Sequence, residues 1–168
     1  MSAKKTALYG MFLALALVAG YLETLVPINP GVPGVKLGLA NIVKMIVLYT
    51  VGFPAAMAFA MIRIILSGLL FGSGFAMVYS AAGAFLSMVV MALLKKTGHF
   101  SAVGVSIAGG VFHNIGQILV AALVLETGAL VYYLPVLILS GLAAGILIGI
   151  LSGILIRRVG PMVREMTQ

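Results

Sequence analysis

The chain is a succession of long apolar runs separated by breaks of only a few residues, and this arrangement restricts its fold more than any other feature. Runs of about 20 apolar residues match the ~30 Å hydrocarbon thickness of a bilayer. Because only 8% of the 168 residues are charged, polar side chains are too few to cover a water-soluble surface. We therefore expect an all-α, multi-pass protein of the cell membrane, with a single integral membrane domain over residues 1–168.

Proline, glycine and charged residues mark the breaks between the runs. The first run follows Lys4 and Lys5, as in a signal peptide, but it ends at Glu23 and Pro27 without a small-residue cleavage site, so we expect a retained helix. The breaks predict a bundle of six transmembrane helices, over residues 6–26, 35–51, 54–71, 75–94, 102–125 and 132–156.

Basic residues cluster before the first helix, after the fourth and after the sixth, at Lys4–Lys5, Lys95–Lys96 and Arg157–Arg158. Positively charged loops stay in the cytoplasm, so both termini are expected there, and Lys36 and Glu126 are expected outside. The second helix is short, with a rise of about 22–26 Å. We expect it to begin below the outer surface, beneath a proline-rich loop, and irregular backbone at that depth indicates a pocket.

Several kinds of chemistry are absent from the sequence. It has no cysteine and no aspartate, and Glu23, Glu126 and Glu165 are its only acids. Paired-carboxylate catalysis, Cys-based metal sites and Asp-rich magnesium sites are therefore excluded, and we expect no catalytic residue, metal or cofactor. The net charge of +7 comes mainly from residues that flank the apolar runs, so it indicates membrane topology rather than nucleic-acid binding.

Polar residues at the expected membrane midplane are the main functional signal: Lys44, Arg63, His113 and Asn114. A Lys or Arg at mid-helix costs about 2.5–3.5 kcal/mol on the insertion scale, so exposure to lipid is unfavourable. Helical spacing places Asn41 beside Lys44, and Gln117 beside His113 and Asn114. A positive pocket without its counter-ion suits an anionic ligand. The predicted ligand-binding residues are Glu23, Lys36, Asn41, Lys44, Arg63, His113, Asn114 and Gln117.

A purely structural interpretation stays open. Lys44 and Arg63 could extend toward the interface or bond helix carbonyls, while His113 and Asn114 hold helices together. Glu23 could contact a ligand or neutralise Lys36 or Arg63. Metal binding at His113 is not expected, because the only other histidine, His99, falls in the expected cytoplasmic loop after the fourth helix.

The segment Pro30-Gly31-Val32-Pro33-Gly34-Val35-Lys36-Leu37-Gly38-Leu39-Ala40-Asn41-Ile42, after a first helix rich in small residues, carries a family resemblance. The chain resembles the Gx transporter or heptaprenyl diphosphate synthase component I family over nearly its whole length. Members of that family are similar to the S components of energy-coupling factor (ECF) transporters. The resemblance implies a six-helix bundle with a ligand pocket near the outer face and a first helix that docks a transmembrane coupling subunit.

Gly10 and Ala14 have the four-residue spacing that permits close helix contact, so they are the expected docking residues under this resemblance. Packing within the bundle is the alternative, and Gly141, Gly145 and Gly149 form a second row with the same spacing. No Gly-rich phosphate loop is present, so cytoplasmic ATPases would be separate subunits.

The expected function is substrate binding in an importer of a small, anionic nutrient or cofactor precursor. The first alternative is a non-catalytic membrane accessory protein in isoprenoid or quinone metabolism, and a further alternative is an uncatalysed channel or scaffold. A prenyl synthase of the usual kind is not expected, because its Asp-rich magnesium motifs cannot be built from this sequence.

Overall fold

The computed structural model describes residues 3–25 and 38–167, which form six α-helices and one 3-10 helix and contain no strand. The helices are α1 (Ala3–Leu25), α2 (Ala40–Thr50), α3 (Phe53–Phe71), α4 (Gly74–Thr97), α5 (Ala102–Val124) and α6 (Leu134–Thr167), with η1 (Gly128–Tyr133) before α6. Within this part of the chain, five helical segments are long and apolar enough to cross a membrane, and α2 is shorter. The chain is thus an all-helical, multi-pass membrane protein.

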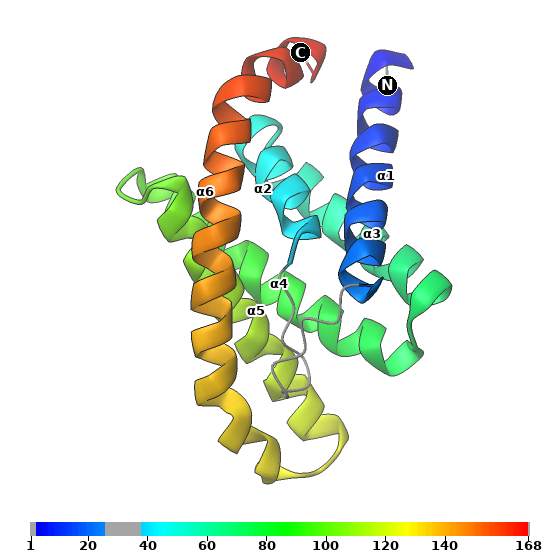
Figure 1. Cartoon of the computed structure of the whole chain (residues 1–168), viewed down its shortest axis with the longest axis vertical. Coiled ribbons are helices and arrows are strands. Elements are labelled where there is room, and N and C mark those ends of the chain that lie inside the picture. Colours follow the sequence, from blue (N-terminus) through cyan, green and yellow to red (C-terminus); the bar gives the residue numbers. More distant parts are fainter. Residues whose placement is uncertain (1–2, 26–37, 168) are drawn as a thin grey trace.

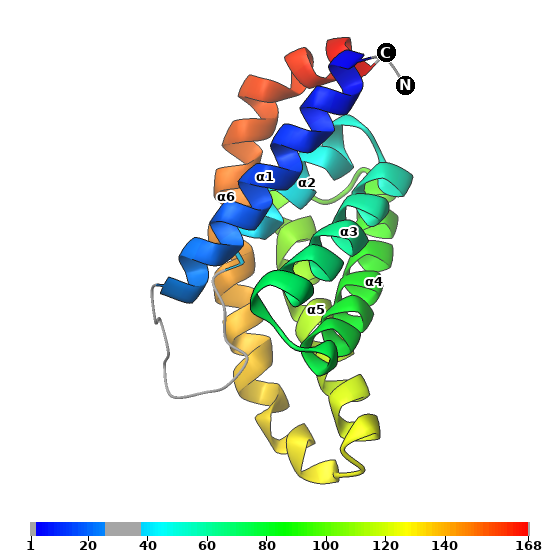
Figure 2. The same cartoon turned by 90° about the vertical axis from the view of Figure 1, so that its right-hand side faces the viewer.

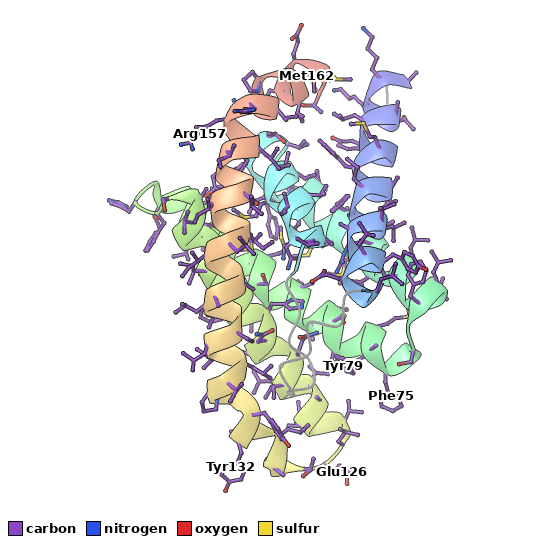
Figure 3. The ribbon with its side chains drawn as sticks, in the orientation of Figure 1. Phe75, Tyr79, Glu126, Tyr132, Arg157 and Met162 are labelled. Carbon is purple, nitrogen blue, oxygen red and sulfur yellow. The ribbon has the colours of Figure 1, made fainter. Side chains whose placement is uncertain are left out.

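The helices run alternately up and down. Figures 1 and 2 show both termini at one end of the molecule, with the α2–α3 and α4–α5 connections in the same half and the α3–α4 and α5–α6 connections in the other. In Figure 3, Arg157 and Met162 lie at the end of the termini, whereas Glu126 and Tyr132 lie at the opposite end. The basic residues near the C-terminus and the acidic α5–α6 connection therefore occupy opposite sides of the bundle, as the charge pattern predicts.

Helix α2 lies at the centre of the bundle and packs against α1, α3 and α6. All its residues from Val43 to Leu48 are buried, and its eleven residues rise only about 16 Å, roughly half of the bilayer core. The sequence predicted a helix from residue 35. The structure begins it at Ala40, because Gly38 has a left-handed φ of +77°, which a continuous helix cannot contain. Residues 35–37 lie outside the described part of the chain.

The last helix extends beyond its predicted end at residue 156 and continues through Pro161 to Thr167. Proline removes one helical hydrogen bond, and the end of α6 turns away from the axis of the rest (Figure 1). Val163 is fully buried in the core, and the neighbouring Gly160 lies against Thr50 at the end of α2. The predicted end was wrong because burial of this last segment over α2 stabilises helix that local sequence signals would stop.

Candidate functional site

Two basic side chains meet inside the bundle, one from α2 and one from α3. Lys44 is only 6% exposed, and it interacts electrostatically with Arg63, which is partly buried. Neither head group has a hydrogen-bond or ion-pair partner among the residues that the structure describes. Like charges in a low-dielectric interior repel, so this pair is unfavourable unless a negative group approaches it.

The nearest acidic side chain is Glu23, at the end of α1. Its Oε1 accepts a hydrogen bond from the backbone N–H of Gly38, and its charge also interacts favourably with Arg63. One turn earlier, a Cβ added at Gly20 would lie 3.8 Å from Nη1 of Arg63, so the guanidinium reaches the surface of α1. Three helices thus bring together Glu23, Lys44 and Arg63, which we call the basic cluster; it holds two positive charges and one negative charge.

Asn41 lies at the edge of the basic cluster, one turn before Lys44 on α2. Its backbone N–H donates to the carbonyl of Gly38 at 2.7 Å, and its side-chain amide lies close to the same glycine. Glu23 and Asn41 therefore meet at Gly38, where the backbone enters α2. The predicted site residue Lys36 lies outside the described residues.

The predicted polar residues of α5 divide between two neighbouring helices. His113 and Gln117 lie against α4, where a Cβ added at Gly83 would be 3.1 Å from Nδ1 of His113 and 2.7 Å from Cγ of Gln117. Asn114 faces α6 instead, and its Nδ2 donates to the carbonyl of Leu137 at 2.6 Å. His113 and Gln117 share a face, as their spacing predicts, whereas Asn114 makes an interhelical link.

The structure thus brings together Glu23, Asn41, Lys44 and Arg63. The α5 residues contact other helices: His113 and Gln117 lie against α4, and Asn114 is bonded to α6.

Three glycines contribute to these contacts, and sequence reasoning did not identify them. Gly83 leaves room for His113 and Gln117, Gly38 supplies an N–H to Glu23, and Gly20 lies at ordinary contact distance from Arg63. Each glycine lies in or beside an apolar run, where helix propensity disfavours it. That unfavourable placement is a signal of close approach, but the sequence does not say which side chain approaches.

The chemistry available at the basic cluster is electrostatic. The described residues contain no group of three or more His, Cys, Asp or Glu side chains that could hold a metal ion. Buried Lys and Arg head groups are strong hydrogen-bond donors to carboxylate or phosphate oxygens. Recognition of an anion is therefore the chemistry for which the arrangement is suited.

No curated protein and no solved structure matches this chain significantly. A family model does match it, over residues 12–155, and it describes heptaprenyl diphosphate synthase component I. The match begins in α1 and ends in α6, so it includes the whole basic cluster and the α5 group. The chain belongs to the heptaprenyl diphosphate synthase component I family.

Proposed function

We propose that this protein is the substrate-binding subunit of an energy-coupling factor type importer, similar to S components, and that it binds a small anionic nutrient or cofactor precursor. The observation that carries the proposal is the proximity of the buried Lys44 and the partly buried Arg63, whose only nearby acid among the described residues, Glu23, already accepts a hydrogen bond from Gly38. An anionic ligand would supply the charge that the basic cluster lacks.

Energetics support this interpretation over a purely structural one. At about 2.5–3.5 kcal/mol for each mid-membrane cation, the pair costs roughly 5–7 kcal/mol on the insertion scale. Packing of α2 and α3 could be achieved with two apolar residues at no such cost. Retention of both cations is explained if ligand binding offsets the cost. His113, Gln117 and Lys36 remain proposed ligand contacts, and Asn114 remains one with a structural alternative.

The protein itself is proposed not to be an enzyme. With three glutamates, no aspartate and no phosphate-binding loop, it lacks the groups for magnesium-dependent prenyl transfer or ATP hydrolysis. Cytoplasmic ATPases and a transmembrane coupling subunit would supply the energy. The proposed docking surface for the coupling subunit is the outward face of α1, where Ala14 is exposed and a Cβ added at Gly10 would meet no atom within 4 Å.

We further propose that the end carrying both termini faces the cytoplasm. The protein contains no cysteine, so single cysteines report sidedness directly. In intact cells, an impermeant maleimide should label Glu126→Cys and leave His99→Cys unlabelled, since both positions are exposed but lie in opposite connections. The reverse labelling pattern would invert the proposed orientation.

The alternative function is a non-catalytic accessory role in isoprenoid or quinone metabolism, which the name of the matched family favours. Mass spectrometry of ligand released from protein purified in mild detergent distinguishes the two functions. We expect a water-soluble anion from the native protein and from the exposed-charge control Lys4→Met, and none from Arg63→Met. A prenyl lipid would favour the accessory role, and an anion retained by Arg63→Met would show that the basic cluster does not bind it.

A further inference from the structure

An apolar groove of about 560 Å³ opens on the outside of the bundle, and none of the residues that line it belongs to the basic cluster. It lies between the end of α2, the start of α3 and the last turns of α4. Its apolar walls include Leu48, Phe53, Val89 and Leu93, and two lysines stand at its α4 end, Lys95 and Lys96. The volume falls within the roughly 300–1,000 Å³ of pockets that hold small organic ligands.

The two lysines have different surroundings. Nζ of Lys95 donates to the carbonyl of Leu48 at 2.6 Å and lies 5.1 Å from the centre of the Tyr49 ring. Leu48 is in the last turn of α2, where carbonyls have no partner within the helix, so Lys95 completes the end of α2 and forms part of the groove wall.

Lys96 is exposed and has no hydrogen-bond or ion-pair partner among the residues that the structure describes. None of the three glutamates of the sequence lines the groove. The groove therefore combines a long apolar wall with one free positive charge at its mouth.

We propose that this groove binds an anionic phospholipid of the leaflet on the side of the termini, with an acyl chain along the apolar wall and the headgroup phosphate on Lys96. Leu93 is 60% exposed and belongs to the membrane-crossing part of α4, so bilayer lipid reaches the groove without any partner protein. Basic pockets between transmembrane helices are known to favour anionic headgroups, and one lysine near the surface gives a preference of roughly fivefold.

The experiment uses the absence of tryptophan from the protein. Leu93→Trp places a single fluorophore at the rim of the groove. The protein is reconstituted in nanodiscs of one fixed composition, with bromine carried either by a minor fraction of phosphatidylglycerol or by an equal amount of phosphatidylcholine. We expect brominated phosphatidylglycerol to quench the tryptophan more strongly, by an occupancy ratio of about fivefold.

Lys96→Gln should remove this preference, whereas Arg158→Gln, which removes an equally exposed cation at the same end of the molecule, should preserve it. Equal quenching by both lipids would overturn the proposal, as would a preference that survives Lys96→Gln. Quenching by neither lipid would also overturn it and would indicate that lipid does not enter the groove.

A second measurement does not depend on the tryptophan variant. Native mass spectrometry of the unmodified protein, extracted from mixed bilayers, counts retained phosphatidylglycerol against phosphatidylcholine. The retained excess of phosphatidylglycerol should fall in Lys96→Gln and persist in Arg158→Gln, and any other pattern would contradict the proposed site.

Discussion

The α5–α6 pair and the α1–α3 part of the bundle use the same residue types in opposite ways. Between α5 and α6, a Cβ added at Gly145 would lie 2.6 Å from Cα of Ile107, so the two backbones are already in contact. The polar side chain there, Asn114, is hydrogen-bonded to α6. On α1, Gly10 faces open space. In the same part of the bundle, Lys44 and Arg63 lie near each other, and neither head group has a bonded partner among the described residues.

The contrast between these two regions distinguishes residues that pack the bundle from residues to which we assign a function. A glycine that touches backbone and a polar group that is fully bonded stabilise the fold. A glycine with no neighbour and a buried charge with no partner weaken it, so they require another explanation, which the proposed ligand binding and docking would supply. The four predictions below test this division, in order of decreasing expected effect.

The largest effect is expected at the α5–α6 contact. Gly145→Ala should destabilise the folded bundle by about 3 kcal/mol, the upper end of the usual cost of overpacking, because the added methyl group would meet backbone that cannot rotate away. Gly153→Ala, on the same helix, is the control: its nearest non-local atom would be 3.8 Å away, and the better helix propensity of alanine should leave stability equal or higher. Thermal unfolding in detergent, followed by circular dichroism, measures both. Equal stability of the two variants would contradict the close α5–α6 contact.

The second prediction concerns the buried cation. Lys44→Met should stabilise the ligand-free protein, by about 2.5 kcal/mol at most, because it removes a poorly compensated charge that Arg63 repels. The same variant should lose affinity for the native ligand, as measured by the amount of ligand that co-purifies. If Lys44→Met instead unfolds, while its residual folded fraction binds ligand normally, Lys44 is structural.

A smaller effect is expected at Asn114. Asn114→Leu should cost about 0.6–1.7 kcal/mol, the range of interhelical hydrogen bonds in membranes, because the carbonyl of Leu137 loses its donor from α5. That carbonyl keeps the bond from Oγ of Ser140, at 2.9 Å, which limits the loss. The shift in unfolding midpoint measures the cost. A fall in ligand affinity as large as that of Arg63→Met would instead make Asn114 a ligand contact.

The smallest effect on stability is expected on α1. Gly10→Leu should leave the free energy of unfolding and the ligand affinity nearly unchanged, because a Cβ added at Gly10 meets no atom of the described residues within 4 Å. It should nevertheless abolish co-purification with the proposed coupling subunit and the proposed uptake in cells, since close helix contact is short-ranged. Normal uptake by Gly10→Leu would move the docking surface away from this face. The row of Gly141, Gly145 and Gly149 is not a substitute, because it packs against α5 within the bundle.

The helical architecture followed from the sequence because lipid imposes it. Apolar runs of spanning length must become helices in a bilayer, where backbone groups find no water, so the number of apolar helices and their alternation could be predicted. The start of α2 and the end of α6 could not be predicted in this way. The start of α2 depends on the left-handed backbone of Gly38, and the end of α6 depends on the burial of Val163. Neither feature is a local helix propensity.

The sequence by itself predicts which polar residues lie near the middle of the membrane, because position along a helix fixes the expected depth: Lys44, Arg63, His113 and Asn114 were all identified from the expected helix ends. Only the tertiary structure decided which of them meet. Rotation of each helix about its own axis depends on side-chain packing against several neighbours at once, so Asn114 turned to α6 while Arg63 reached Gly20 and Glu23. Tertiary packing also distinguishes Gly10 of α1, which faces open space, from Gly141, Gly145 and Gly149 of α6, which pack against α5. Both helices carry small residues at the same four-residue spacing, so the sequence alone does not tell them apart.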